Sequence, residues 1–150
     1  MVILDVNVLV YAAQRESQDH QVFKDWLEAL LRSDRTFGVP EVVLCNVVRV
    51  VTLPRPWKRP LSTPEALAFC SALRSSPRCL VLQPSERHWQ LFEDLCRRAN
   101  AAANMVNDAY LAAFALDRDA EWVTADRDFA RFPGLTWRLL PDGQLLTNPR

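Results

Sequence analysis

The aspartates that could take part in chemistry lie where apolar segments of the chain begin or end. These residues are Asp5, Asp108, Asp126 and Asp128. A carboxylate at the end of a buried segment is unfavourable unless it has a partner. Carboxylates that share a site also repel one another unless a cation neutralises them. The pattern therefore predicts one shared site for a divalent metal ion with oxygen ligands, and metal-assisted chemistry on a phosphate group.

Each aspartate also has a purely structural explanation, and the sequence leaves both open. Asp5 precedes a predicted helix and can serve as its N-cap. Asp108 can be an acid in the first turn of a helix, where the helix dipole favours it. Asp126 and Asp128 can belong to a polar turn. Chance alone does not readily place acids after both the first apolar strand and the strand near residue 122.

The elements that must position these acids alternate between strands and helices. Short apolar runs predict strands at residues 2–5, 37–39, 79–82, 121–124 and 137–140. Helical periodicity and capping residues predict helices at residues 6–13, 17–32, 40–51, from 63 onwards, 85–99 and 106–118, with a helical turn at 128–132. This alternation predicts an α/β fold with a mainly parallel sheet. Sites in such folds lie outside the carboxyl ends of the strands, where Asp5 and Asp126 are expected.

The length and charge limit the class of protein. A chain of 150 residues is expected to form a single domain, residues 1–150. Its 18 basic and 18 acidic residues cancel, so a nucleic-acid partner requires a local basic patch.

The cysteines and the first residues of the chain indicate the cellular compartment in which the protein is expected. Four cysteines with no C-x-x-C spacing, and only two histidines, argue against a zinc site. Buried free thiols are typical of a reducing compartment, so we expect a cytoplasmic protein. The opening residues lack the features of a signal peptide, and no apolar run reaches the ~20 residues of a membrane span.

Three segments, taken in order, resemble the motifs of PIN-domain ribonucleases, and among these the VapC-type toxins. The opening Val-Ile-Leu-Asp-Val-Asn at residues 2–7 is similar to the first motif. Asn107-Asp108-Ala109-Tyr110 and its continuation resemble the helix that carries the third acid. Thr124-Ala125-Asp126-Arg127-Asp128-Phe129 resembles the segment of the fourth acid. Together the motifs cover nearly the whole chain.

The resemblance implies a PIN-like three-layer α/β/α sandwich and an endoribonuclease that depends on Mg²⁺ or Mn²⁺ and acts as a toxin. It implies catalytic acids at Asp5, Asp108 and Asp126, with Asp128 as a further candidate metal ligand. Asn7 and Thr124 are expected to support these acids by hydrogen bonds. The implied partners are an RNA substrate, a VapB-type antitoxin and a second copy of the chain in a homodimer, with no membrane.

The chain departs from the family at one position. The family places a glutamate six residues after the proline that opens its helix, and counting from Pro40 this position is Asn46. Asn46 offers a neutral oxygen but no charge. Glu41 lies roughly 140° away around the helix, because the period is ~3.6 residues, so it faces elsewhere.

This departure keeps a second function open, namely a catalytically weak binding module with the same fold. A haloacid-dehalogenase-like phosphatase is a third possibility, since it also has an acid after its first strand. That class requires a second aspartate where this chain has Asn7, and a lysine near the later acids, whereas the only lysines are Lys24 and Lys58.

A basic segment interleaved with an aromatic residue is the candidate RNA contact. No acid lies between Glu41 and Glu65, and this stretch carries Arg49, Arg55, Trp57, Lys58 and Arg59. Cations beside an aromatic side chain suit an RNA backbone and an unstacked base. A solvated proline-rich loop is the alternative. Arg127 and Arg131 flank the last acids and can contact either phosphate or those acids.

Overall fold

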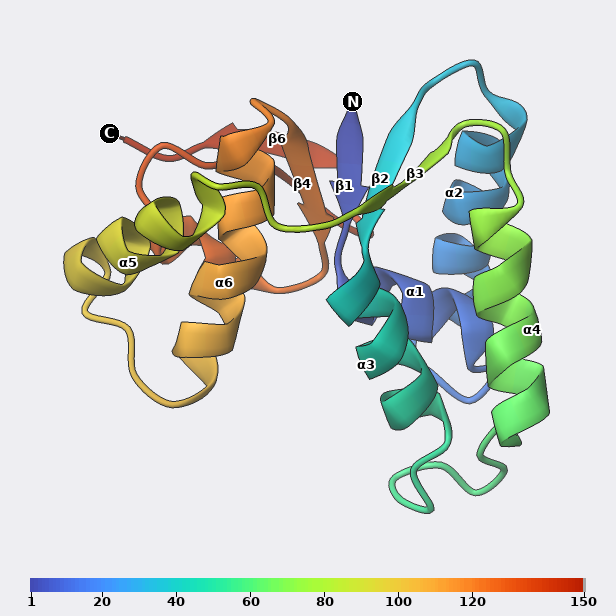
Figure 1. Ribbon diagram of the computed structural model, residues 1–150. Helices are drawn as coiled ribbons and strands as arrows, with labels where there is room; N and C mark the ends of the chain where they lie inside the picture. The colour runs from blue at the N-terminus through green and yellow to red at the C-terminus, as the bar shows by residue number, and fades with distance from the viewer. Residues whose placement is uncertain (150) are drawn as a thin grey trace.

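The computed structural model describes residues 1–149, and in this range six strands form one sheet in the order β3-β2-β1-β4-β5-β6 (Figure 1). The strands are β1 (Val2–Leu4), β2 (Phe37–Pro40), β3 (Cys79–Leu82), β4 (Glu121–Thr124), β5 (Thr136–Leu139) and β6 (Gln144–Thr147). The first five run parallel, and β6 pairs antiparallel with β5. The sheet is therefore mainly parallel, as predicted.

Helices cover both faces of the sheet. They are α1 (Val6–Ala13), α2 (His20–Arg32), α3 (Glu41–Val51), α4 (Thr63–Arg74), α5 (His88–Arg98) and α6 (Asn104–Asp117), with the 3₁₀ helix η1 at Arg127–Arg131. Figure 1 shows α1 to α4 on one side of the sheet and α5 and α6 on the other. The right-handed rule for crossovers in parallel sheets explains this, because the chain changes direction across the sheet after β3. The predicted three-layer α/β/α sandwich is confirmed.

The central strands are fully buried because helices cover both of their faces. Every residue of β1 and β2 is buried, which explains their continuous apolar runs. Gly38 on β2 fits a narrow space, since a Cβ atom there would lie 2.6 Å from Cδ1 of Leu82. Beneath β4 and β5 the core holds the large rings of Trp122, Phe129 and Trp137.

The structure corrects several details of the predicted elements, and the helix predicted at residues 85–99 begins at His88. Strand β6 was not predicted, because its residues are largely exposed and show no alternation of apolar and polar side chains. Helix α6 begins at Asn104 rather than near residue 106, so Asp108 lies beyond its first turn. The helix predicted to begin at Ser17 starts at His20, while the Ser17 hydroxyl donates to the carbonyl oxygens of Tyr11 and Gln14.

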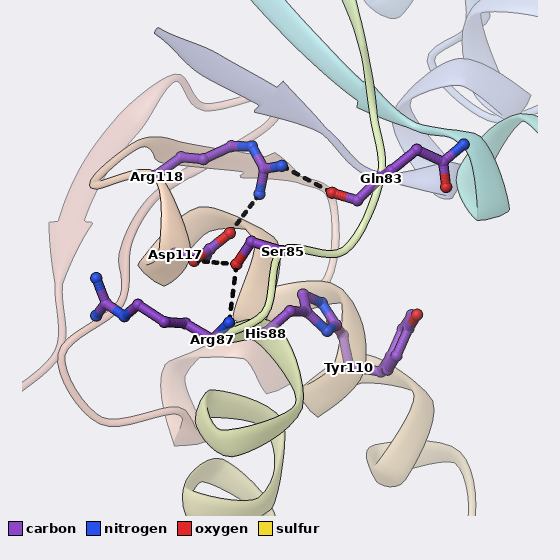
Figure 2. A network of polar contacts seen from close by, with 7 residues as sticks. All are labelled: Gln83, Ser85, Arg87, His88, Tyr110, Asp117 and Arg118. Atoms are coloured by element: carbon purple, nitrogen blue, oxygen red, sulfur yellow. Dashed lines mark hydrogen bonds and ion pairs between the residues drawn. The ribbon is translucent and has the colours of Figure 1, made fainter.

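Helices α5 and α6 are joined by a polar network near the end of β3 (Figure 2). The Ser85 hydroxyl and the Arg118 guanidinium both donate to the carboxylate of Asp117, each at 2.7 Å, and Arg118 also donates to the carbonyl of Gln83. His88 lies 3.0 Å from the carbonyl oxygen of Tyr110 and is 1% exposed. Burial lowers the pKa of His88, so its ring packs in the neutral form. This network fixes α6, the helix that carries Asp108.

No helix within residues 1–149 has both the length and the apolar character needed to cross a lipid bilayer.

Candidate active site

A pocket of about 410 Å³ lies where β1 and β4 end, and three of the predicted acids line it. Figure 1 shows α1, α3 and α6 below the end of β1, where this edge of the sheet lies. The lining residues are Asp5, Val6, Asn7, Val10, Tyr11, Asn46, Arg49, Val50, Pro56, Trp57, Asn107, Asp108, Leu111, Asp126 and Phe129. Residues separated by more than a hundred positions in sequence therefore meet in one cavity.

Asp5 lies at the centre of this arrangement and is only 4% exposed. Its Oδ1 accepts the backbone N–H of Val6 at 2.6 Å, which makes Asp5 the N-cap of α1. Its Oδ2 accepts the hydroxyl of Thr124, also at 2.6 Å. Burial raises the pKa of Asp5 to about 7, and the carboxylates of Asp108 and Asp126 add to this rise against the lowering effect of both hydrogen bonds. Asp5 therefore has two roles, because it is both the N-cap of α1 and one of the acids of the candidate site.

Thr124 bonds directly to Asp5 and to Asp126, whereas Asn7 bonds to Thr124 and to the backbone and reaches the acids only through them. The Asn7 amide donates to the Thr124 hydroxyl oxygen at 3.1 Å, and its carbonyl accepts the backbone N–H of Ala125. The same hydroxyl oxygen accepts the N–H of Asp126 at 3.0 Å. Since Thr124 in turn donates to Asp5, this chain of bonds fixes Asp5 relative to Asp126.

Asp108 is half-buried on α6 and faces the same pocket. Burial raises its pKa to about 6, and the negative charges of Asp126 and Asp128 contribute further. Raised pKa values on neighbouring carboxyls are expected where like charges share a site without a counter-ion. The electrostatics therefore favour a bound cation.

Asp128 and Arg127 lie outside the pocket. The exposed carboxylate of Asp128 pairs with Arg131 at 3.5 Å, and its backbone N–H donates to Asp126 at 2.8 Å. Arg127 pairs with Asp142 at 3.3 Å on the surface. In this arrangement Asp128 acts on the site through its charge and its backbone, while both arginines have acidic partners away from the pocket.

Asn46 does line the pocket, at the position that the family resemblance assigns to an acid. Its Oδ1 accepts a hydrogen bond from Nε of Arg49 at 3.3 Å. Glu41 faces away, as the helical period predicts, and contacts Arg74 and Gln83 instead. No acidic residue of α3 replaces the negative charge of the glutamate that the family has at this position.

The proline-rich loop at residues 52–62 is held in place by hydrogen bonds that residues 57–59 donate to neighbouring segments. The indole N–H of Trp57 donates to the carbonyl of Val50 at 2.9 Å, so the ring forms part of the pocket wall. The Glu16 carboxylate accepts the backbone N–H groups of Lys58 and Arg59, at 2.7 and 2.8 Å. Those two side chains and that of Arg55 are exposed beside the pocket rather than within it.

The donor set suits a hard divalent cation, although it is not a closed cage. Within residues 1–149, no three His, Cys, Asp or Glu side chains are arranged closely enough to form a ready metal centre. Mg²⁺ commonly keeps several waters and is bound through one or two carboxylates. Asp5, Asp108 and Asp126, whose charges already act on one another, fit that description.

Sequence reasoning missed part of the pocket wall. Asn107 and Tyr11 line the cavity without having been proposed for it. Each had a signal, because Asn107 precedes Asp108 and Tyr11 lies one helical turn beyond Asn7. The position of Phe129, whose ring is buried against Trp122 at 5.3 Å, depended on tertiary packing and had no local signal.

Comparison with known proteins decides the family. The family model described as PIN domain matches residues 2–135. The chain belongs to the PIN domain family. It is 42% identical over 144 residues to Ribonuclease VapC43 of Mycobacterium tuberculosis, covering 96% of this chain and 98% of that protein. It is 37% identical to Ribonuclease VapC31 of the same species, covering 88% and 93%. This PIN-domain chain is therefore a VapC-type ribonuclease, as the motifs indicated.

Solved structures show the same fold. VapBC2 from Rickettsia felis, solved bound to a DNA fragment from its promoter, matches with a TM-score of 0.70 and 21% identity, over 93% of this chain and 98% of that one. VapC20 of Mycobacterium tuberculosis, a sarcin–ricin loop cleaving toxin, matches with a TM-score of 0.64 and 16% identity, over 88% and 96%. The comparisons favour the ribonuclease over the phosphatase considered from sequence.

Asp5→Asn should stabilise the metal-free protein at high pH. Because the pKa of Asp5 is about 7 in the folded state and 3.8 for an ordinary aspartate, the folded chain keeps a proton that the unfolded chain loses between about pH 4 and 7. The free energy of unfolding must therefore fall as pH rises through this window. We expect the variant to be more stable by roughly 2–4 kcal/mol at pH 8 and unchanged at pH 4. Urea unfolding in EDTA at both pH values measures the free energy of unfolding, and the exposed Asp119→Asn variant is the control. The prediction would be contradicted if the wild type and both variants showed the same pH dependence.

Asn46→Glu should tighten Mg²⁺ binding. A carboxylate at this position adds negative charge to a pocket whose other acids are already held near one another, which favours a divalent cation. Calorimetry at fixed pH measures the affinity, and we expect a rise of about tenfold. Asn46→Gln controls for the added length of the side chain. An unchanged affinity would mean that position 46 has no influence on the metal.

Proposed function

We propose that this VapC-type protein is the toxin of a toxin–antitoxin pair and an endoribonuclease that uses Mg²⁺ or Mn²⁺ to hydrolyse RNA phosphodiester bonds. The observation that carries the proposal is the convergence of Asp5, Asp108 and Asp126 on one pocket, where burial and mutual repulsion raise the pKa values of Asp5 and Asp108. The names of its relatives support the ribonuclease class.

Asp5, Asp108 and Asp126 would hold the cation in this scheme. When bound, the cation would lower the pKa of a water molecule and neutralise charge on the scissile phosphate. Thr124 and Asn7 orient the acids, since their hydrogen bonds fix Asp5 relative to Asp126. The buried floor formed by Val10, Leu111 and Phe129 limits access of bulk water, which strengthens each electrostatic interaction in the pocket.

Asp5→Asn and Asp108→Asn should abolish RNA cleavage. Both amides are close in size to the carboxyls they replace but carry no charge for the cation, so each should cost on the order of 100-fold or more in rate. Cleavage of single-stranded RNA with Mg²⁺ measures the loss, and relief of growth arrest on expression gives a second readout.

Asp119→Asn is the matched control for this experiment, because it makes the same change on an exposed residue away from the pocket. Circular dichroism checks that each variant is folded. Cleavage at the wild-type rate by either site variant would show that the ligand assignment is wrong.

We propose that RNA contacts come from the loop at residues 52–62, which carries the candidate residues Arg55, Trp57, Lys58 and Arg59. The loop is held by Glu16 and by the Trp57 indole N–H, so its cations are presented from a fixed backbone beside the acid pocket. Because that N–H is already bonded to Val50, the Trp57 ring is available for stacking rather than for hydrogen bonding to a base. Arg127 is a weaker candidate, since Asp142 already pairs with it.

Replacing Arg55, Lys58 and Arg59 together by alanine should weaken RNA binding and flatten its salt dependence. The slope should fall by up to about one unit for each phosphate group that the variant no longer binds. Trp57→Ala should cost roughly 1–3 kcal/mol of binding energy, and Trp57→Phe much less, because phenylalanine keeps a stacking face. Binding titrations across a salt series measure both effects.

Removing three exposed cations elsewhere, Lys24, Arg32 and Arg97, gives the same change in net charge and serves as the control. An unchanged affinity and slope in the loop variant would identify the loop as a linker or as a surface for another partner.

We also propose a VapB-type antitoxin and a homodimer as partners. The solved VapBC structures that share this fold support the antitoxin. Trp89 on α5 is 60% exposed and packs against Phe92 at 5.2 Å, which gives that helix an apolar surface suited to a second copy.

One observation favours a second candidate function, a binding module with weak catalysis. The pocket has an amide at position 46 where the family has an acid, and no other residue of α3 replaces that charge. Metal titration separates the two functions, because a working nuclease must bind Mg²⁺ or Mn²⁺ at the pocket and a mere binding module need not.

A further inference from the structure

Within residues 1–149, Arg49 is the one cation that lines the acid pocket, and its side chain is exposed. It lies one helical turn beyond Asn46 on α3, and its Nε donates to the Asn46 Oδ1 at 3.3 Å. Helix α3 therefore contributes a positively charged guanidinium and a neutral amide to the pocket, whereas other segments contribute the negatively charged acids.

The guanidinium of Arg49 remains free to bind a further group. Within residues 1–149 it makes no ion pair, although Arg127 and Arg131, the two arginines near the acids in sequence, both pair with carboxylates. Only Nε of Arg49 is engaged, so its two terminal nitrogens keep their donors. A guanidinium with free terminal N–H groups is well suited to bind phosphate oxygens in a bidentate manner.

Asn46 is well suited to hold that guanidinium. An amide oxygen accepts the Nε–H without placing a negative charge beside the guanidinium, as a glutamate at the same position would. The residue that departs from the family pattern is thus the one that orients Arg49 in the pocket. Its oxygen already has this hydrogen bond and need not serve as a metal ligand.

We propose that Arg49 is a catalytic residue that donates hydrogen bonds from its terminal nitrogens to the non-bridging oxygens of the scissile phosphate, and that Asn46 is its positioning residue. This inference rests on the proposed ribonuclease function. Positive charge fixed beside the phosphate stabilises the negative charge that develops on it as the P–O bond to the leaving oxygen breaks. Arg49 thereby supplies charge on the side of the pocket where α3 has no acid to bind metal.

The test compares Arg49→Gln, Arg49→Lys and Asn46→Ala with the wild type in two assays. The first is steady-state cleavage of short single-stranded oligoribonucleotides with Mg²⁺, which separates kcat from KM. The second is Mg²⁺ binding by calorimetry without RNA. Arg87→Gln is the matched control, because Arg87 is exposed at the start of α5 and Figure 2 shows its guanidinium without an interaction drawn to it.

We expect Arg49→Gln to lower kcat about 100-fold or more, which is the usual effect of removing one donor to a developing negative charge. Arg49→Lys should recover little of this loss, because an ammonium lacks the planar pair of donors. Asn46→Ala should lower kcat about tenfold, since it leaves Arg49 in place but unrestrained. None of these variants should weaken Mg²⁺ binding, and Arg87→Gln should match the wild type in both assays.

Two results would overturn the inference while leaving the proposed function intact. Cleavage by Arg49→Gln at the wild-type rate would show that the arginine does not act on the phosphate. A marked loss of Mg²⁺ affinity in Asn46→Ala would show that the amide binds metal instead of positioning Arg49. A wild-type protein that cuts no RNA with Mg²⁺ or Mn²⁺ would overturn the proposed function and this inference together.

Discussion

The burial of the Asp5 carboxylate at the junction of β1 and β4 is the constraint on which the site depends. The backbone N–H of Asp5 donates to the carbonyl of Val123, which extends the pairing of the two strands by one step. Its carboxylate then caps α1 through Val6 and accepts the hydroxyl of Thr124. One residue therefore joins a strand end, a helix start and the neighbouring strand, so the geometry of the acids is set by the same bonds that close the fold.

The burial of Asp5 lowers the stability of the ionised protein, although the proposed function requires this carboxylate in the pocket. A buried acid with a pKa near 7 resists ionisation, and the neighbouring acids increase that resistance. The surrounding fold tolerates the cost because the packing beneath it is extensive, with Phe129 against both Trp122 and Phe132. A cation at the pocket would remove the repulsion, so metal binding and folding are expected to be coupled.

Much of the fold could be predicted from sequence because its signals are local. Continuous apolar runs identified the buried parallel strands, and the acids at their ends indicated where a site would form. Strand β6 could not be found in this way, because it is exposed on its outer side and its pairing with β5 depends on tertiary contact. The hydrogen bonds of Trp57 and Glu16 could not be predicted either, since a loop without periodicity gives no sign of which backbone groups will be bonded.

The same distinction applies within the site. Asn46 was recognised by its offset from Pro40, and the structure does place it in the pocket. Its hydrogen bond with Arg49 became clear only from the structure, because residues three apart lie on the same face only where the chain is helical. The pocket has acids from α6 and from just beyond the ends of β1 and β4, and it has an amide, a guanidinium and an indole from α3 and its following loop. A phosphodiester that contacts both sets of side chains would meet a cation site at the acids and the guanidinium of Arg49 on α3. This difference between the two sets of side chains indicates which groups of the pocket would bind the cation and which would bind the phosphate.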